Sequence, residues 1–195
     1  MPKGKIIGKG AEAVLTLVSF KGRTAVAKDR LRKAYRHPLL DGKLRKNRTR
    51  REEKVLRRLN ELGIQSPQFL DAKGTQIVFS FEKGATAKNV KLTPPILKQI
   101  GTQLARMHDA GVAHGDFTTS NVMVEGGRVK IIDFGLSVFS HEVEDLATDL
   151  VLFEKTVSPA EFKVFLKAYA SEKKNSRAVI ARFGEIKQRG RYVER

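Results

Sequence analysis

The chain has 195 residues, of which 41% are hydrophobic and 30% are charged. Its length allows a small lobe packed on a larger one but is short for two full domains. The composition excludes a disordered chain, and the lack of cysteine excludes disulfides and thiolate metal sites, as expected for a reducing compartment.

Neither a spanning segment nor an apolar signal region is visible in the sequence. No stretch approaches the roughly 20 apolar residues that a transmembrane helix needs. The first residues, Met1 to Lys5, run directly into Ile6 and Ile7 without an apolar region behind them. We therefore expect a cytoplasmic protein.

The formal charge of +17 is unevenly distributed. From Lys21 to Arg58 there are 16 basic and 4 acidic residues, and from Lys173 to Arg195 there are 8 basic and 2 acidic ones. Between Gln103 and Lys163 the balance reverses, with 5 basic and 10 acidic residues. This pattern indicates a polyanionic partner at the basic parts and metal–phosphate chemistry at the acidic centre, although an arginine-rich solvated helix face is the simpler alternative.

The first part of the chain predicts strands around one helix. Short runs rich in apolar and β-branched residues predict strands at 14–20, 24–27, 69–70 and 76–81. A turn at 21–23 joins the first two strands. Apolar residues at helical spacing, Val55, Leu56 and Leu59, predict a helix over 43–62 that Gly63 closes.

The second part reads as mostly helical. Residues 84–91 resemble a hinge, after which Thr93 is expected to cap a helix that begins at Pro94. Two strands at 121–125 and 129–132 flank a Gly-Gly turn, and Ser158 to Glu161 form a capping box before a helix through Tyr169. The order predicts an α+β, bilobal chain: a β-rich lobe over 1–83, a linker over 84–91 and a helical lobe over 92–195.

A glycine-containing loop near the N-terminus is a candidate phosphate-covering loop. Gly8, Lys9, Gly10 and Ala11 begin a degraded G-x-G-x-x-G pattern between two short strands, with Ala13 in place of the third glycine. The alternative is an ordinary hairpin turn. A Walker loop is excluded because no Gly-Lys-Ser/Thr follows.

Lys28 ends an apolar strand and is a candidate for the lysine that holds the α- and β-phosphates of a nucleotide. The alternative is a strand-end surface lysine. Its expected partner is a glutamate on the next helix. We choose Glu52 over Glu53 because Val55, Leu56 and Leu59 place Glu52 at the border of the apolar face.

The strongest signal is the segment from His114 to Asn121, which fits H-x-D-x-x-x-x-N. In this pattern Asp116 accepts or orients the proton of the phosphate acceptor, and Asn121 binds magnesium. Asp133 follows the next strand, in Asp-Phe-Gly, as a second magnesium ligand. These residues predict ATP- and Mg²⁺-dependent phosphoryl transfer on a protein-kinase-like fold, with His114 orienting or packing and His108 structural.

The cluster before the hinge predicts the adenine site. We expect the backbone of this cluster to contact the adenine base and the Phe79 side chain to lie at the back of the pocket. The residues of the cluster are Phe79, Ser80, Phe81 and Glu82.

The sequence resembles the small atypical kinases of the KEOPS complex, the PRPK type of archaea and eukaryotes. The resemblance rests on four stretches of sequence. They are Thr-Thr-Ser within the segment 114–121, the run from Lys28 to Glu52, the segment from Glu142 to Leu150, and Arg-Gly-Arg at 189–191. It covers essentially the whole chain.

The resemblance implies a serine kinase and ATPase that supports formation of N6-threonylcarbamoyladenosine at position 37 of tRNA. Its implied partners are a metal-containing synthase subunit, other KEOPS subunits and tRNA. Asp149 would brace the catalytic loop. The tail 191–195 is less basic than the family's usual ending, Gly115 replaces the arginine of conventional kinases, and no Ala-Pro-Glu segment follows Asp133.

Two alternatives stay open beside this hypothesis. One is another H-x-D phosphotransferase, of the Rio type or a small-molecule kinase. The other is a basic tRNA-docking scaffold with a vestigial ATP site.

Glu12 in the glycine loop would repel phosphates. We therefore expect Glu12 to form a salt bridge to Lys28 before ATP binds.

Overall fold

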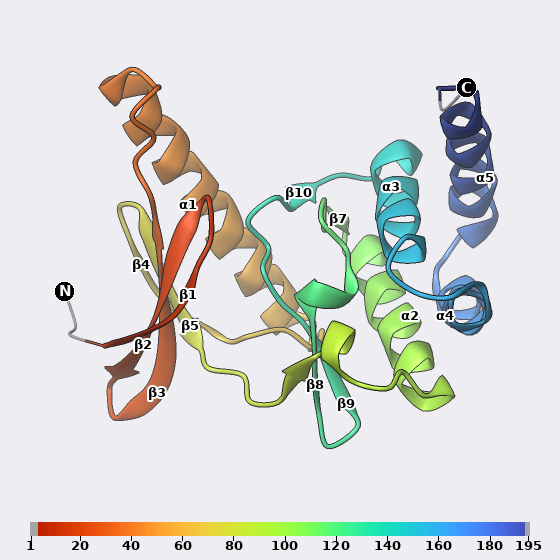
Figure 1. Cartoon of the computed structure of the whole chain (residues 1–195), viewed down its shortest axis with the longest axis horizontal. Coiled ribbons are helices and arrows are strands. Elements are labelled where there is room, and N and C mark those ends of the chain that lie inside the picture. Colours follow the sequence, from red (N-terminus) through yellow and green to blue (C-terminus); the bar gives the residue numbers. More distant parts are fainter. Residues whose placement is uncertain (1–3, 194–195) are drawn as a thin grey trace.

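The computed structural model describes the backbone of residues 4–193 and the side chains of residues 4–189. A sheet and one long helix form the N-terminal lobe, and most of the remaining helices form the other lobe (Figure 1). The predicted α+β, bilobal architecture is therefore confirmed. The tail 191–195 singled out in the sequence lies outside the described side chains.

The N-terminal lobe contains a five-stranded antiparallel sheet. Its strands, in spatial order, are β1 (Lys5–Lys9), β2 (Ala13–Phe20), β3 (Arg23–Arg30), β5 (Gln76–Ser80) and β4 (Phe69–Lys73). Lys21 and Gly22 join β2 to β3 with φ of 48° and 76°, the positive values that a tight two-residue hairpin turn requires. This hairpin places Lys28 near the end of β3.

Helix α1 (Pro38–Glu61) begins before the predicted residue 43. Proline at the first helical position needs no N–H partner there, and this start was not recognised in the sequence. The helix ends as predicted at Gly63, which has a φ of 65°. The N–H of Gly63 donates to the Asn60 carbonyl and that of Ile64 to the Leu59 carbonyl, which is the Schellman arrangement.

The segment 84–91, predicted as a linker, contains a short strand of its own. β6 (Ala85–Thr86) pairs with β8 (Val122–Glu125), which in turn pairs with β9 (Arg128–Ile131). A 3-10 turn, η1 (Ala87–Asn89), follows β6. The hinge region is thus attached to the second lobe by backbone hydrogen bonds, and the exact lobe boundaries stay a prediction.

Within the described residues, the second lobe is built on four helices together with several smaller elements (Figure 1). The helices are α2 (Pro94–Asp109), α3 (Val143–Glu154), α4 (Pro159–Glu172) and α5 (Ser176–Val193). The small elements are β7 (Val112–Ala113), η2 (Thr119–Asn121) and β10 (Val138–Phe139).

Helices α2 and α4 pack closely together. A Cβ at Gly101 of α2 would lie 2.5 Å from the Phe165 carbonyl oxygen of α4, so glycine is needed at that contact. The Ser158–Glu161 capping box at the start of α4 is present, as predicted. Thr93 occupies the N-cap position of α2, but its side chain makes no capping hydrogen bond. Within residues 4–193, no helix is long and apolar enough to cross a membrane.

Candidate active site

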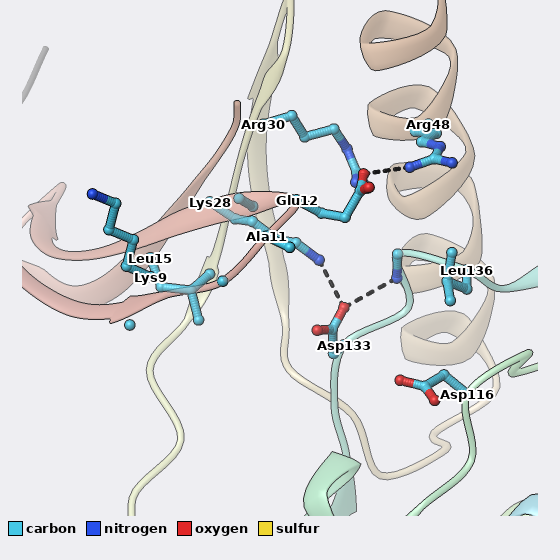
Figure 2. A pocket seen from close by; sticks show the side chains of 14 residues that line it. Lys9, Ala11, Glu12, Leu15, Lys28, Arg30, Arg48, Asp116, Asp133 and Leu136 are labelled. Carbon is cyan, nitrogen blue, oxygen red and sulfur yellow. Dashed lines mark hydrogen bonds and ion pairs between the residues drawn. The ribbon is translucent and has the colours of Figure 1, made fainter. Parts of the chain in front are cut away.

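Lys28 lies between two carboxylates that come from different lobes, of which Figure 2 shows Asp133. Its Nζ is 2.7 Å from Glu52 Oε1 on α1 and 2.8 Å from Asp133 Oδ1 after β9. Glu53, the alternative partner, pairs with Arg57 on the helix surface instead. The predicted choice of Glu52 therefore agrees with the contacts, and the buried lysine is not a surface residue.

Arg30 is a second cation at this centre that sequence reasoning missed. It follows Lys28 by two residues on β3, so both side chains share one face of the strand. Its Nη2 lies 2.5 Å from Glu52 Oε2, and its buried Nε has no hydrogen-bond partner among the described atoms. Glu52 is therefore the counter-charge that two buried cations share, and Asp133 supplies a second one at Lys28.

Asp133 adopts a strained backbone conformation at the end of its strand. Its φ is 61°, and the Gly135 N–H donates to its Oδ1 at 3.2 Å. Burial opposes ionisation of the carboxylate, but the charge and hydrogen bond of Lys28 outweigh it and lower the pKa of Asp133. A Cβ at Gly135 would lie 3.1 Å from Asp133 Oδ1 and 3.2 Å from Lys28 Nζ, so a side chain there would crowd this ion pair.

Asp116 and Asn121 face one another across the loop between β7 and β8. Asn121 Nδ2 donates to the Asp116 carboxylate at 2.9 Å and to its carbonyl oxygen at 2.8 Å. Both side chains border the same cleft as Lys28 and Asp133. The structure therefore brings four of the predicted site residues together at one cleft: Lys28, Asp116, Asn121 and Asp133.

The backbone of this loop is held by Asp149 of α3. Its carboxylate accepts the N–H of His114 at 2.6 Å and that of Gly115 at 2.9 Å. A Cβ at Gly115, where φ is 77°, would lie 2.6 Å from the Leu136 carbonyl oxygen. The close approach of the two loops explains why a larger residue such as arginine does not stand at this position.

Both histidines near the loop are buried and have structural partners. His114 Nε2 lies 3.0 Å from the Ile132 carbonyl oxygen and His114 Nδ1 lies 3.3 Å from the Asp116 N–H. His108 lies between the Tyr169 hydroxyl and the Asp149 carboxylate, at 2.8 and 3.1 Å. Burial lowers the pKa of His108 despite the neighbouring carboxylate. Neither imidazole is placed as a general base.

The cleft between the lobes consists of two adjoining pockets of about 430 and 420 Å³. They share Leu15, Lys28 and Asp133. One is lined by the glycine loop, including Gly8, Lys9, Gly10 and Ala11, and by Asp116. The other is lined by the segment before the hinge, Phe79, Ser80, Phe81 and Glu82.

Side-chain contacts fix this second pocket. Phe79 packs against the main core, Ser80 Oγ donates to Glu82 Oε1 at 2.5 Å, and Glu82 also pairs with Lys130 of β9. The apolar lining of the pocket, with backbone at its edge, suits a flat aromatic base.

The expected salt bridge between Glu12 and Lys28 is wrong. Glu12 Oε2 lies 2.5 Å from Arg48 Nη1, whereas Lys28 is engaged by Glu52 and Asp133 (Figure 2). Arg48 precedes Glu52 by one turn of α1 and so reaches the glycine loop from the same face of the helix. No spacing pattern in the sequence links positions so far apart.

The oxygen ligands at the centre suit magnesium. Within the described part of the chain, no group of three or more His, Cys, Asp and Glu side chains could hold a metal by itself. Asp133 and Asn121 supply oxygen donors at the cleft, and magnesium typically uses one or two such ligands together with substrate phosphates. The donor set therefore fits Mg²⁺ bound with a nucleotide.

Comparisons with known proteins agree with this geometry. The family model described as the RIO domain matches residues 14–152. The KEOPS complex subunit Bud32 of Pyrococcus abyssi is 34% identical over 98% of this chain and 97% of its own length. The chain belongs to the Bud32 family of RIO-domain proteins. The resemblance stated from the sequence is thereby confirmed.

Other Bud32-related proteins are longer than this chain. A probable bifunctional tRNA threonylcarbamoyladenosine biosynthesis protein of Methanosarcina mazei is 37% identical over 99% of this chain, which covers 36% of that relative. The chain thus spans about a third of the length of this relative. Among solved structures, the Rio2 kinase of Chaetomium thermophilum superimposes with a TM-score of 0.66 at 16% identity, covering 96% of this chain and 71% of that one. The fold is that of a kinase-like phosphotransferase.

Proposed function

We propose that this protein transfers the terminal phosphoryl group of ATP at the cleft between its lobes. The observation that carries the proposal is Lys28, held by Glu52 and Asp133 while Asp116 and Asn121 border the same cleft. Phosphoryl transfer needs this combination of a phosphate-holding cation, oxygen ligands for magnesium and a carboxylate that orients the acceptor.

Each residue has a distinct role in this proposal. Lys28 binds the phosphates, and Glu52 keeps its ammonium group in place. Asp133 and Asn121 hold Mg²⁺, which neutralises charge that develops on the phosphates. Asp116 accepts a hydrogen bond from the acceptor hydroxyl or water and orients it towards the phosphorus. The adenine lies against Phe79 to Glu82, and Gly8 to Ala11 cover the phosphates.

The proposed acceptors are water and protein serine. Serine or threonine phosphorylation and ATP hydrolysis need the same centre, because both deliver an O–H group to Asp116. The missing Ala-Pro-Glu segment favours an enzyme without a conventional peptide platform. We propose ATP hydrolysis in support of threonylcarbamoyladenosine formation on tRNA as the main activity.

The proposed assembly is a cytoplasmic KEOPS complex with a metal-containing synthase subunit. The Pyrococcus relative is named a KEOPS complex subunit, and the Methanosarcina relative a tRNA threonylcarbamoyladenosine biosynthesis protein. The basic run also supports tRNA as a partner, because α1 exposes Lys43, Lys46, Arg50, Arg51, Lys54 and Arg58.

The scaffold alternative is less well supported. Lys28 and Glu52 form a buried ion pair, and burying charges is costly. A vestigial ATP site would have no need for such buried charges.

The proposal is tested by measuring phosphate release from ATP and serine phosphorylation, with and without the synthase subunit and tRNA. Lys28→Met should abolish both activities, and stimulation by the synthase subunit would favour the ATPase role. Fold-retaining Lys28→Met with unchanged turnover would contradict the site. Binding of tRNA should weaken steeply with salt, with a slope of about −0.9 per phosphate neutralised in duplex regions.

A further inference from the structure

Arg48 and Glu12 form an ion pair at the end of the cleft that lies under the glycine loop (Figure 2). The pair joins α1 to the loop at 2.5 Å, and its side chains are 34% and 50% exposed. Neither residue takes part in the proposed reaction steps. A carboxylate beside a phosphate-binding loop needs an explanation, because it repels the ligand.

The order of residues along the cleft places this pair near the terminal phosphate. Phe79 to Glu82 line one pocket, Lys28 and Asp133 border both, and Arg48 and Glu12 line only the other. A nucleotide with its base at the first pocket and its inner phosphates at Lys28 extends its last phosphate into the pocket that Arg48 lines. Asp116, which faces the acceptor, lines this same pocket.

The chemistry of the pair favours its exchange for a phosphate. A partly exposed ion pair contributes little to stability, so it opens readily. Arginine binds phosphate through two parallel hydrogen bonds, and a terminal phosphate carries more charge than a carboxylate.

The backbone of the glycine loop has contacts besides the Glu12–Arg48 pair, and the Glu12 carboxylate also lies 3.9 Å from Lys33 Nζ. The Leu31 N–H donates to the Glu12 carbonyl at 3.0 Å, and Lys33 Nζ donates to the Ala11 carbonyl at 2.5 Å. These backbone contacts remain when the Glu12–Arg48 pair opens.

We propose that Arg48 is an additional phosphate-binding residue that contacts the terminal phosphate of ATP. Glu12 occupies the guanidinium of Arg48 in the free protein and competes with the nucleotide for it. This inference rests on the proposed function, because it takes the cleft to be an ATP site.

The test is a double-mutant cycle on nucleotide affinity, with Mg²⁺–ATP and Mg²⁺–ADP titrated against the full chain. The variants are Arg48→Ala, Glu12→Gln and the two combined. Arg57→Ala serves as the matched control, because Arg57 is an exposed arginine of the same helix whose ion pair with Glu53 lies outside the pocket. Lys28→Met reports on the ATP site itself.

Arg48→Ala should weaken ATP binding by about tenfold, the usual effect of losing a charged hydrogen bond, and should affect ADP much less. Glu12→Gln should strengthen ATP binding several-fold, and Arg48→Ala should still weaken it in the Glu12→Gln background. No effect of Arg48→Ala in that background would mean that Arg48 only neutralises Glu12, and equal losses for ATP and ADP would exclude the terminal phosphate. Either result overturns this inference alone, whereas ATP binding that does not depend on Lys28 overturns the proposed function as well.

Discussion

The Asp149 carboxylate on α3 accepts the backbone N–H of His114 at 2.6 Å, just before Asp116. It also accepts the N–H of Gly115, and no part of Asp149 is exposed to solvent. Asp149 therefore positions the backbone that carries the candidate catalytic carboxylate, although it does not border the cleft.

Asp149→Asn should lower turnover more than tenfold and destabilise the fold by about 1–3 kcal/mol. The two N–H groups bond different carboxylate oxygens, and asparagine replaces one of these oxygens with an NH2 group that cannot accept. Turnover and urea unfolding of the same preparations check this. The control is Asp145→Asn, an exposed carboxylate of the same helix, which should change neither. Full activity of Asp149→Asn would contradict the positioning role.

His108 makes stability depend on pH. Burial holds its pKa below the ordinary value of 6.5, so the unfolded chain binds a proton that the folded chain does not. This contribution to stability is fully present above pH 6.5 and is lost as pH falls below it, by up to about 1.4 kcal/mol per pH unit.

His108→Gln should reduce this slope, because glutamine bonds Tyr169 and Asp149 without titrating. Unfolding free energies of both proteins between about pH 5 and pH 8 measure the effect. Parallel pH profiles would show that His108 does not cause the slope.

Glu52 should stabilise the fold as well as support activity. Glu52→Gln leaves the buried side chains of Lys28 and Arg30 without their shared counter-charge. Removing one partner of a buried ion pair costs about 3–5 kcal/mol. Urea unfolding should show this loss, whereas the surface change Glu53→Gln should stay within about 0.5 kcal/mol. Equal stabilities of the two variants would contradict the buried network.

Gly115 should tolerate no side chain. Alanine there combines an unfavourable φ of 77° with a Cβ placed 2.6 Å from the Leu136 carbonyl oxygen. Gly126→Ala is the matched control, because its φ is 55° and no atom lies within 4 Å of the added Cβ. Gly115→Ala should lose stability and turnover, while Gly126→Ala should show only the backbone cost of about 1 kcal/mol. Similar thermal and kinetic effects would exclude the close approach as the cause.

Local sequence patterns predicted the elements whose signals lie within a few residues. The Gly-Gly hairpin, the Ser158 capping box and the glycine end of α1 are examples, and the spacing of Val55 and Leu56 also identified Glu52. The partners of Glu12 and Arg30 depend on how α1 crosses the sheet, which no local pattern encodes. For the same reason the sequence did not show that β6 joins the sheet of the second lobe.

The most direct test of the account measures Mg²⁺-dependent phosphate release from ATP by wild type and Asp133→Asn, with the synthase subunit and tRNA present. Asparagine suits the positive φ at position 133 and keeps the shape of the side chain, so the variant isolates the charge. Asp116→Ala is measured alongside and should lower turnover by about 10²–10⁴-fold if it acts as the base. Asp133→Asn should abolish the magnesium-dependent turnover; undiminished ATP hydrolysis by both folded variants would contradict the assignment of this site.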